Sequence, residues 1–396
     1  ALTQILHRFL PRLFTSHDTK RHQTLLQIAR ALRRLQEIYY FKNQGILSFY
    51  AGIYMLNIAE RVGRPTPELA IARSNFVVSL GLLRWHRQAQ YYAAQVMRQI
   101  EQQDKQTVAA VYTRLGLYHA ARGEWQVATD YIQYAINLYR QLGDITGSGE
   151  ALALLGFTQL LQGQLTLASA QFDQLEQVAA ISSNREYTAW AIIGRASLSA
   201  LRGDFQAAYD MGLAAQQLLQ ATTDRAAYLN NLGVLAYGAV RLGDFSSAEA
   251  YLRDIDTALA KRALLNYVGA GAYTYRILAA LWIRQQNTGA IEVKQLQYYL
   301  KALKRFSRTF SILQPRYYIL QALASRVIYP DSSKPMIKTL RKALQLAERK
   351  KMAYEKAIAE FYLGRVNKDQ LLLDSAQQYF DQMGITIHES DNALFS

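Results

Sequence analysis

The chain has 396 residues, of which 51% are hydrophobic and only six are proline, so it can bury an extended core and is too poor in helix breakers for a disordered protein. It has no cysteine, which excludes a disulfide framework and thiolate metal sites and is typical of a reducing compartment, so we expect a cytoplasmic protein. The net charge of +15 favours anionic partners.

Residues 1–14 have the apolar spacing of an amphipathic helix and no signal-peptide cleavage site, so we expect residues 1–21 to form an N-terminal helix or linker. The chain opens on Ala1 in the middle of this pattern, which leads us to expect a piece of a longer protein. The longest apolar stretch, 264–283, is interrupted by Asn266 and Arg276, which argues against a membrane span.

A repeat occupies the middle of the chain. Two weaker helix pairs, centred near Ala51 and Ala89, precede it. The repeat itself places a glycine every 40 residues and an alanine five residues after each glycine: Gly123 and Ala128, Gly163 and Ala168, Gly203 and Ala208, Gly243 and Ala248. An apolar residue follows four positions after the alanine in three repeats, and the third repeat departs from this with Gly212.

These positions predict a helix hairpin. Glycine adopts positive φ at little cost, so it can end the first helix in a tight turn, and the small alanine lets the second helix approach closely. Small residues in the first helices, such as Gly116 and Gly156, fall where a larger side chain would push the partner helix away. The order of small residue, turn, alanine and aromatic resembles the tetratricopeptide signature, whose usual period is about 34 residues.

Three later pairs continue the array, at residues 263–306, 314–349 and 352–383. We therefore predict an all-α, right-handed solenoid of about eight tetratricopeptide-like hairpins with a period of 38–40 residues, which fills residues 22–384. Residues 385–396 are expected to be a disordered tail.

More specific strings occur near both ends of the array. They are Ile38 to Asn43, Tyr54 to Arg61, Pro67 to Ala70, Tyr354 to Ala357, Leu363 to Arg365 and Ala376 to Gly384. These strings resemble the C-terminal tetratricopeptide region of large bacterial signalling ATPases, in which a nucleotide cyclase or kinase domain and a STAND-like or AAA-like ATPase precede a helical tail. The resemblance implies a sensor or scaffold role for this part, with catalysis outside this chain.

No catalytic or cofactor-binding constellation is present in the sequence. The string from Gly143 to Gly149 lacks the lysine of a phosphate-binding loop and reads as a loop between repeats. The six histidines are scattered without metal-ligand spacing, and no serine lies in a nucleophile elbow. We therefore expect a chain that is not an enzyme and needs neither metal nor cofactor.

Positive charge is concentrated in residues 294–351, where fourteen lysines and arginines stand against two acidic residues. The candidate docking residues of this tract are Lys301, Lys304, Arg305, Arg308, Lys338, Arg341 and Lys342. Interleaved aromatics, among them Tyr298, Tyr299, Phe306 and Tyr317, leave open an acidic protein, an anionic membrane surface or nucleic acid as partner, with nucleic acid disfavoured. The alternative is an ordinary solvated helix surface above a packed core.

A second candidate surface is the inner face that first helices line in tetratricopeptide arrays. The candidate groove residues are Asn230, Tyr237, Arg241, Tyr273, Arg276 and Tyr317, because tyrosine and arginine combine contact area with directed hydrogen bonds. With 27 tyrosines in the chain, a packing role for any one of them remains the main alternative.

Three functions remain open at this stage. The first is a protein-interaction and sensor scaffold, the C-terminal part of a bacterial signalling ATPase or cyclase-type regulator. The second is an adaptor or assembly factor that uses the basic tract to dock on an acidic protein complex or a membrane surface. The third, a transcriptional regulator module, would need a DNA-reading helix-turn-helix, which the sequence does not show.

Overall fold

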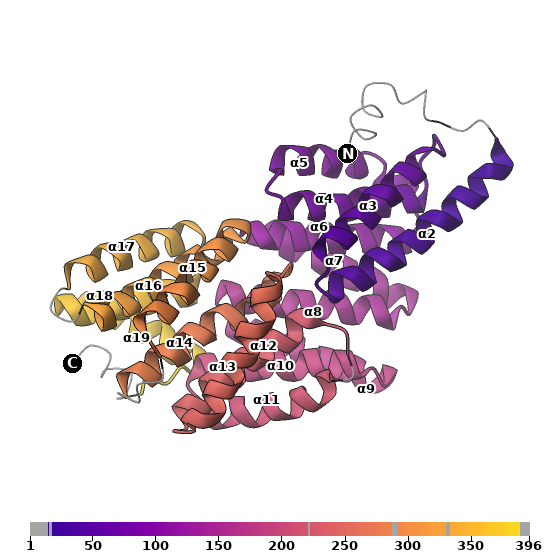
Figure 1. The fold of residues 1–396 in the computed structure, drawn as a ribbon. Coiled ribbons are helices and arrows are strands. Elements are labelled where there is room, and N and C mark those ends of the chain that lie inside the picture. Colours follow the sequence, from indigo (N-terminus) through magenta and orange to yellow (C-terminus); the bar gives the residue numbers. More distant parts are fainter. Residues whose placement is uncertain (1–14, 16–17, 221, 287–290, 330–332, 389–396) are drawn as a thin grey trace. The chain divides into compact units, whose positions relative to one another are not determined.

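The computed structural model describes residue 15 and residues 18–220, 222–286, 291–329 and 333–388. Throughout these ranges the regular elements are helices, and no strand occurs in them (Figure 1). The amphipathic helix expected in residues 1–14 and most of the expected tail, residues 389–396, lie outside the described part of the chain.

Within the described ranges the α-helices follow one another in nine consecutive pairs, one more than the approximate count from the sequence. The pairs are α2 (Thr19–Phe41) and α3 (Gly45–Glu60), α4 (Pro67–Leu82) and α5 (His86–Met97), α6 (Lys105–Arg122) and α7 (Trp125–Leu142), α8 (Ile145–Gln162) and α9 (Leu165–Ser182), α10 (Arg185–Arg202) and α11 (Phe205–Leu219), α12 (Arg225–Arg241) and α13 (Phe245–Lys261), α14 (Gly271–Gln285) and α15 (Val293–Thr309), α16 (Gln314–Ile328) and α17 (Lys334–Arg349), and α18 (Ala353–Asn367) and α19 (Gln370–Met383). Short 3-10 helices η2 (Ile100–Gln102), η3 (Tyr267–Ala270) and η4 (Ser311–Leu313) lie between some of them. The predicted all-helical solenoid is confirmed.

The four turns that repeat every 40 residues share one geometry. Gly163, Gly203 and Gly243 each have φ of +87°, and Gly123 has +80°, values in the left-handed region that only glycine adopts cheaply. The next residue donates its N–H to a carbonyl five positions back, as Asp204 does to Ser199 at 2.9 Å. This bond satisfies a carbonyl that the helix end would otherwise leave unpaired.

The small residues within the pairs are required by close helix contact. The four repeat alanines have no exposed surface. A Cβ on Gly116 would lie 2.5 Å from Ile132 Cγ1, and a Cβ on Gly156 would lie 2.7 Å from the Phe172 ring. Both distances are too short for any side chain, so glycine at these positions sets how closely the two helices pack.

The departure of the third repeat at Gly212 has a structural reason. A Cβ at this position would lie 2.8 Å from Leu235 Cδ2, so the space is filled by a side chain of the following helix, α12. The Gly212 carbonyl also accepts a hydrogen bond from Asn231 Nδ2 at 2.8 Å. Contact with the next pair therefore replaces the apolar side chain that the other repeats carry here.

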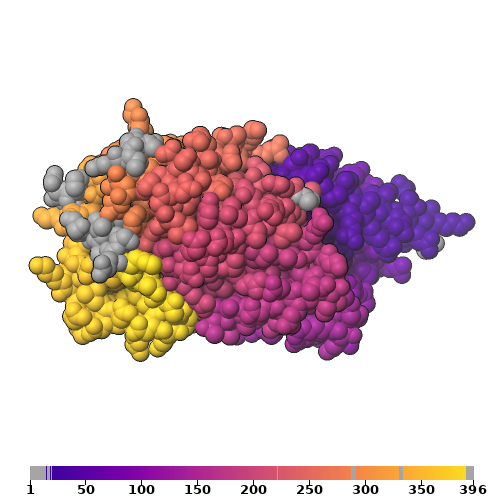
Figure 2. Space-filling view, turned by 90° about the horizontal axis from the view of Figure 1, so that it is seen from below, coloured from indigo at the N-terminus to yellow at the C-terminus, as the bar shows by residue number. Residues whose placement is uncertain are grey.

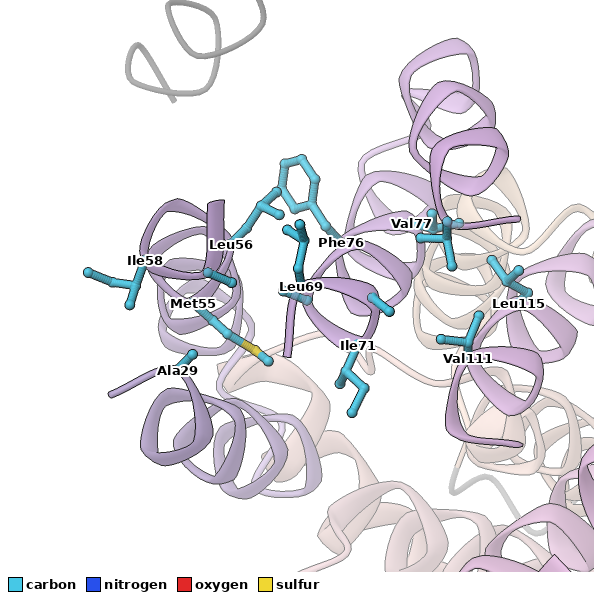
Figure 3. Packing of buried hydrophobic residues seen from close by; sticks show 14 of the residues in the cluster. Ala29, Met55, Leu56, Ile58, Leu69, Ile71, Phe76, Val77, Val111 and Leu115 are labelled. Atoms are coloured by element: carbon cyan, nitrogen blue, oxygen red, sulfur yellow. The ribbon is translucent and has the colours of Figure 1, made fainter. Parts of the chain in front are cut away.

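The chain divides into two compact units. Unit 1 holds α2 to α7 and the first turns of α8, and unit 2 holds the rest of α8 and the helices from α9 to α19. The core of unit 1 joins successive pairs, with Met55 of α3, Phe76 and Val77 of α4, and Leu115 of α6 each at most 5% exposed (Figure 3). Each pair thus buries its apolar face against its neighbours, as expected of a repeat array.

Candidate functional site

Tyrosines and arginines from four successive pairs of unit 2 converge into one group. Its members lie on α12, α14, α16, α18 and α19. We name this group the inner cluster, and it consists of Tyr237, Arg241, Tyr275, Arg316, Tyr354, Glu355 and Tyr379. The first helices of the later pairs pack on one another, α14 on α16 and α16 on α18, which brings together residues that are far apart in the sequence.

Arg241 is held in one orientation by aromatic rings. Its guanidinium carbon lies 3.9 Å from the centroid of the Phe205 ring and 4.3 Å from that of the Trp282 ring. Its Nη1 donates to the hydroxyl of Tyr237 at 2.9 Å, one turn earlier on the same helix face. Tyr237 in turn stacks on Tyr275, with ring centroids 5.6 Å apart and planes 16° apart. Cation–π contacts and a hydrogen bond therefore fix a positive charge beside two stacked phenols.

A buried ion pair lies in the same cluster. Arg316 Nη2 donates a hydrogen bond to Glu355 Oε1, and the side chain of Glu355 is only 1% exposed. Burial raises the pKa of Glu355 above its ordinary value although the Arg316 charge acts in the opposite direction. The second oxygen, Oε2, is buried and accepts no hydrogen bond from the side chains or backbone that the structure describes. A buried acceptor left unpaired in this way costs free energy, which a donor would recover by binding it.

The phenols of the cluster remain protonated at neutral pH. Burial is the main cause that raises the pKa of Tyr275, Tyr354 and Tyr379 above the ordinary value for tyrosine. Each hydroxyl can therefore both donate and accept a hydrogen bond. The cluster combines neutral hydroxyls, two guanidinium groups and flat aromatic surface, which is the chemistry of recognition by contact and hydrogen bonding.

The other predicted groove residues lie elsewhere. Asn230 is 4% exposed, and its Oδ1 accepts the N–H of Gly271 at 2.9 Å, which fixes the start of α14. Tyr273 stacks on Phe306 with centroids 4.3 Å apart. Tyr317 is 5% exposed. Asn230 therefore joins two pairs, Tyr273 packs within its own pair and Tyr317 is enclosed, so these three side chains lie outside the candidate site.

Arg276 is likewise enclosed in the core. Its side chain has no exposed surface, its Nη1 donates to Asp256 Oδ1 at 2.8 Å, and its guanidinium lies 4.1 Å from the centroid of the Tyr299 ring. This arginine joins α13, α14 and α15. Of the six predicted groove residues, only Tyr237 and Arg241 belong to the inner cluster.

Sequence reasoning missed the members contributed by the last pairs. Arg316 appeared only as one charge of the basic tract, while Tyr354, Glu355 and Tyr379 appeared only in strings that carry a family resemblance. One signal for these residues was present in the sequence. Glu355 lies in the first turn of α18, on a stretch that also carries the small apolar residues Ala357 and Ala359, which indicates a buried position. A buried acid at such a place calls for a cationic partner.

The predicted docking residues of the basic tract form an exposed surface on α15 and α17, which both pack on α16. We name this surface the basic face, and it consists of Lys301, Lys304, Arg305, Arg308, Lys338, Arg341 and Lys342. No ion pair joins any of the seven to a carboxylate in the described ranges, and Lys342 Nζ lies 4.4 Å above the Tyr318 ring. Their charge is therefore not neutralised by the described part of the chain.

The aromatics interleaved with these cations point into the core. Tyr299 and Phe306 are 0% and 5% exposed, and Phe310 and Tyr317 are equally enclosed, while Tyr298 is 49% exposed. The sixth interleaved aromatic, Tyr318, is half-buried and faces Lys342. Stacking of bases on a single-strand binding surface needs exposed rings, and of these six aromatics one, Tyr298, is exposed. The arrangement fits an acidic protein surface better than nucleic acid.

The described ranges show neither a metal-ion site nor a membrane-spanning helix. No group of three or more histidines, aspartates or glutamates there is arranged to hold a metal ion. Nor does any helix among those described combine the length and apolar character that a membrane crossing requires.

Comparisons with known proteins connect this geometry to a known fold. Neither a protein-family model nor a curated protein matches the chain. Solved structures do match, and one of them is described as the crystal structure of a Rap protein complexed with competence and sporulation factor. That structure is similar with a TM-score of 0.62 at 9% sequence identity, over 91% of this chain and 97% of that one. The likeness establishes a tetratricopeptide-like all-helical fold and does not by itself transfer a partner.

Proposed function

We propose that this chain is a non-catalytic protein-interaction scaffold whose inner cluster takes a segment of a partner protein. The observation that carries the proposal is the convergence of two arginines, four tyrosines and an incompletely bonded glutamate from five helices of unit 2. Tyrosine and arginine are the residue types enriched at the energetically important positions of protein interfaces.

The chemistry of the cluster defines what it would bind. Stacked phenols and the aromatic sandwich around Arg241 suit a flat or apolar side chain, and Glu355 Oε2 suits an N–H donor. A short peptide segment offers both kinds of group. The solved Rap protein of similar fold is described as a complex, which supports a binding role for such a scaffold.

The test is selection from a displayed library of random short peptides, followed by affinity measurement by fluorescence anisotropy. We expect selected peptides to lose about tenfold or more in affinity with Arg241→Gln, since one interface anchor is worth roughly 1–2 kcal/mol or more. The matched control is Arg262→Gln, an exposed arginine outside the cluster. Failure to enrich any peptide, or equal affinities for the parent and both variants, would refute the proposal.

A second candidate function rests on the basic face. Seven exposed cations on α15 and α17, which both pack on α16 and form no ion pairs through these cations within the described ranges, would attract an acidic protein surface and speed its association. This role belongs to an adaptor or assembly factor and is compatible with the first.

The basic face is tested with a polyglutamate peptide as probe. Changing Lys301, Lys304, Arg341 and Lys342 to glutamine should abolish salt-sensitive binding of this probe. The control changes four exposed arginines of unit 1, Arg61, Arg64, Arg84 and Arg87, to glutamine and removes the same charge. Equal loss in both variants would show that net charge alone drives binding and would refute a docking surface at this place.

The wider context follows from the family resemblance. We propose that the scaffold senses or docks a partner for a bacterial signalling ATPase or cyclase-type regulator, as the strings around Tyr54 and Ala376 suggest. A role as a transcriptional regulator module has no observation in its favour. The test is gene context: a coding sequence for an ATPase or cyclase domain fused to this chain is expected, and a free-standing gene would refute this context.

A further inference from the structure

The last helix pair makes contacts that a simple repeat array lacks. In such arrays each repeat touches only its neighbours. Here Tyr379 of α19 donates its hydroxyl proton to the Gly163 carbonyl at 2.7 Å, across 216 positions of sequence. A Cβ on Gly163 would lie 2.5 Å from the backbone nitrogen of Tyr354, so the α8–α9 turn and the start of α18 are in backbone contact.

The segment after α19 makes a second contact of this kind with the α10–α11 turn. The N–H of Thr386 donates to the Arg202 carbonyl at 2.8 Å, and Arg202 Nε donates to the Met383 carbonyl at 3.2 Å. His388 Nε2 donates to the Gly203 carbonyl at 2.8 Å. In Figure 2 the yellow atoms of the last pair adjoin the magenta and pink atoms of these earlier pairs.

We name the segment from Tyr354 to His388 that makes these contacts the C-terminal clasp. We propose that the clasp is a latch that closes the inner cluster of unit 2 and has to open before a partner segment enters. This inference rests on the proposed function, because it concerns access to the same cluster.

Burial of the cluster is the first reason. Tyr354, Glu355 and Tyr379 belong both to the cluster and to the clasp, and the side chain of Glu355 is only 1% exposed. A partner donor can reach Glu355 Oε2 only when α18 and α19 move away from the α8–α9 turn. The unpaired Glu355 Oε2 and the contacts of the clasp with the α8–α9 turn therefore both belong to the closed state of unit 2.

The nature of the clasp contacts is the second reason. They are a few hydrogen bonds between the clasp and two glycine turns, three of them to turn carbonyls and one from Arg202 Nε to the Met383 carbonyl. Contacts of this kind, few in number and made through backbone groups, open locally at a lower free energy than a packed apolar core. Gly163 and Gly203 carry no side chain, so both turns are in direct contact with the clasp, whereas a Cβ at either position would lie 2.5 Å from a clasp backbone atom.

The test uses a single reporter thiol, because the chain has no cysteine of its own. Leu278 is half-buried on α14 and lies three positions after Tyr275 and four before Trp282, on the same helix face. The full chain with Leu278→Cys is treated with Ellman's reagent, and the rate of thiol modification is measured. Gln378→Cys, at an exposed position, gives the rate of an accessible thiol.

Opening variants should speed the reaction of the reporter. Tyr379→Phe with Arg202→Gln removes two of the clasp hydrogen bonds, each worth roughly fivefold in an equilibrium constant, so we expect the rate to rise about tenfold or more. Gly203→Ala places a methyl group 2.5 Å from the Thr386 carbonyl and should have a similar effect. The matched control is Gly243→Ala, which has the same φ of +87° but no atom near the added methyl group.

Two results would overturn the latch. One is equal reporter rates in the parent, both opening variants and Gly243→Ala, and the other is a parent rate equal to that of the accessible thiol. Circular dichroism establishes that each variant is folded. The thiol assay needs no partner, so its result is independent of the peptide selection. Faster thiol reaction in the opening variants without any selected peptide would support the latch and refute the proposed function. Peptide binding with unchanged thiol rates would refute the latch alone.

Discussion

Three glycines of unit 2 share one backbone conformation and differ in their surroundings, which gives a clean stability experiment. Gly163 and Gly243 both have φ of +87°, but a Cβ on Gly163 would meet the backbone of Tyr354 at 2.5 Å, whereas a Cβ on Gly243 would meet nothing within 4 Å. Alanine at Gly243 therefore carries only the strain of left-handed backbone, about 1 kcal/mol after the loss of unfolded-state entropy.

Alanine at Gly163 adds overpacking against a backbone atom, which typically costs about 1–3 kcal/mol. The total expected loss is therefore about 2–4 kcal/mol. The additional loss cannot exceed the free energy that holds the clasp closed, because α18 can move away instead of overlapping with the methyl group. For a unit of this size one kcal/mol corresponds to about 2–4 °C in Tm, so we expect a fall of roughly 3 °C for Gly243→Ala and roughly 9 °C for Gly163→Ala.

Differential scanning calorimetry is the suitable assay because it separates the transitions of the two units. Gly143→Ala in unit 1, at φ of +66° with open space around it, identifies which transition belongs to unit 1. Equal falls in Tm for Gly163→Ala and Gly243→Ala would refute the reasoning, since they would show that contact between the α8–α9 turn and α18 does not contribute to the stability of unit 2.

Three further predictions concern pH, a buried charge and helix packing. Burial raises the pKa of Glu37, but the charges of Arg114, Arg33 and Arg34 lower it by more, so the pKa in the folded state lies below the ordinary 4.5. The contribution of Glu37 to the free energy of unfolding is therefore complete above pH 4.5 and is lost as the pH falls through the lowered pKa. Glu37→Gln should make the stability of unit 1 depend less on pH in an acid titration followed by circular dichroism. Arg276→Met should lower the free energy of unfolding by about 1–3 kcal/mol in urea titrations, because it removes the charged hydrogen bond from this fully buried arginine to Asp256, whose side chain is 28% exposed and keeps the hydrogen bond from the Tyr299 hydroxyl. Gly194→Ala should cost about 1–3 kcal/mol in the same assay, because its Cβ would lie 2.4 Å from the Phe172 ring.

Each of these has a result that contradicts it. An acid transition unchanged by Glu37→Gln would show that the carboxyl has its ordinary pKa in the folded state. A loss below 1 kcal/mol for Arg276→Met would mean that this arginine is a surface residue, as the groove prediction assumed. Wild-type stability of the Gly194→Ala variant would show that α9 and α10 are not in the close contact described above.

The sequence by itself determined the repeat and much of its physics. Glycines at a spacing of 40 residues, each followed by an alanine, predicted the hairpins because the left-handed turn and the close helix contact depend on the local residue types alone. Local periodicity also explains why the seven cations of α15 and α17 are exposed, since a helix places residues of one period on one face, but whether they dock a partner stays a prediction.

Only the tertiary structure decided which polar residues meet. Arg276 and Arg241 have the same chemistry and both lie in first helices of successive pairs, yet one is enclosed against Asp256 and the other lies between two aromatic rings. The clasp that joins Tyr379 to Gly163 spans 216 positions of sequence. Each pair is rotated slightly relative to the pair before it, and these small rotations add up along the array. A local pattern of residues therefore does not predict which earlier turn the last pair contacts.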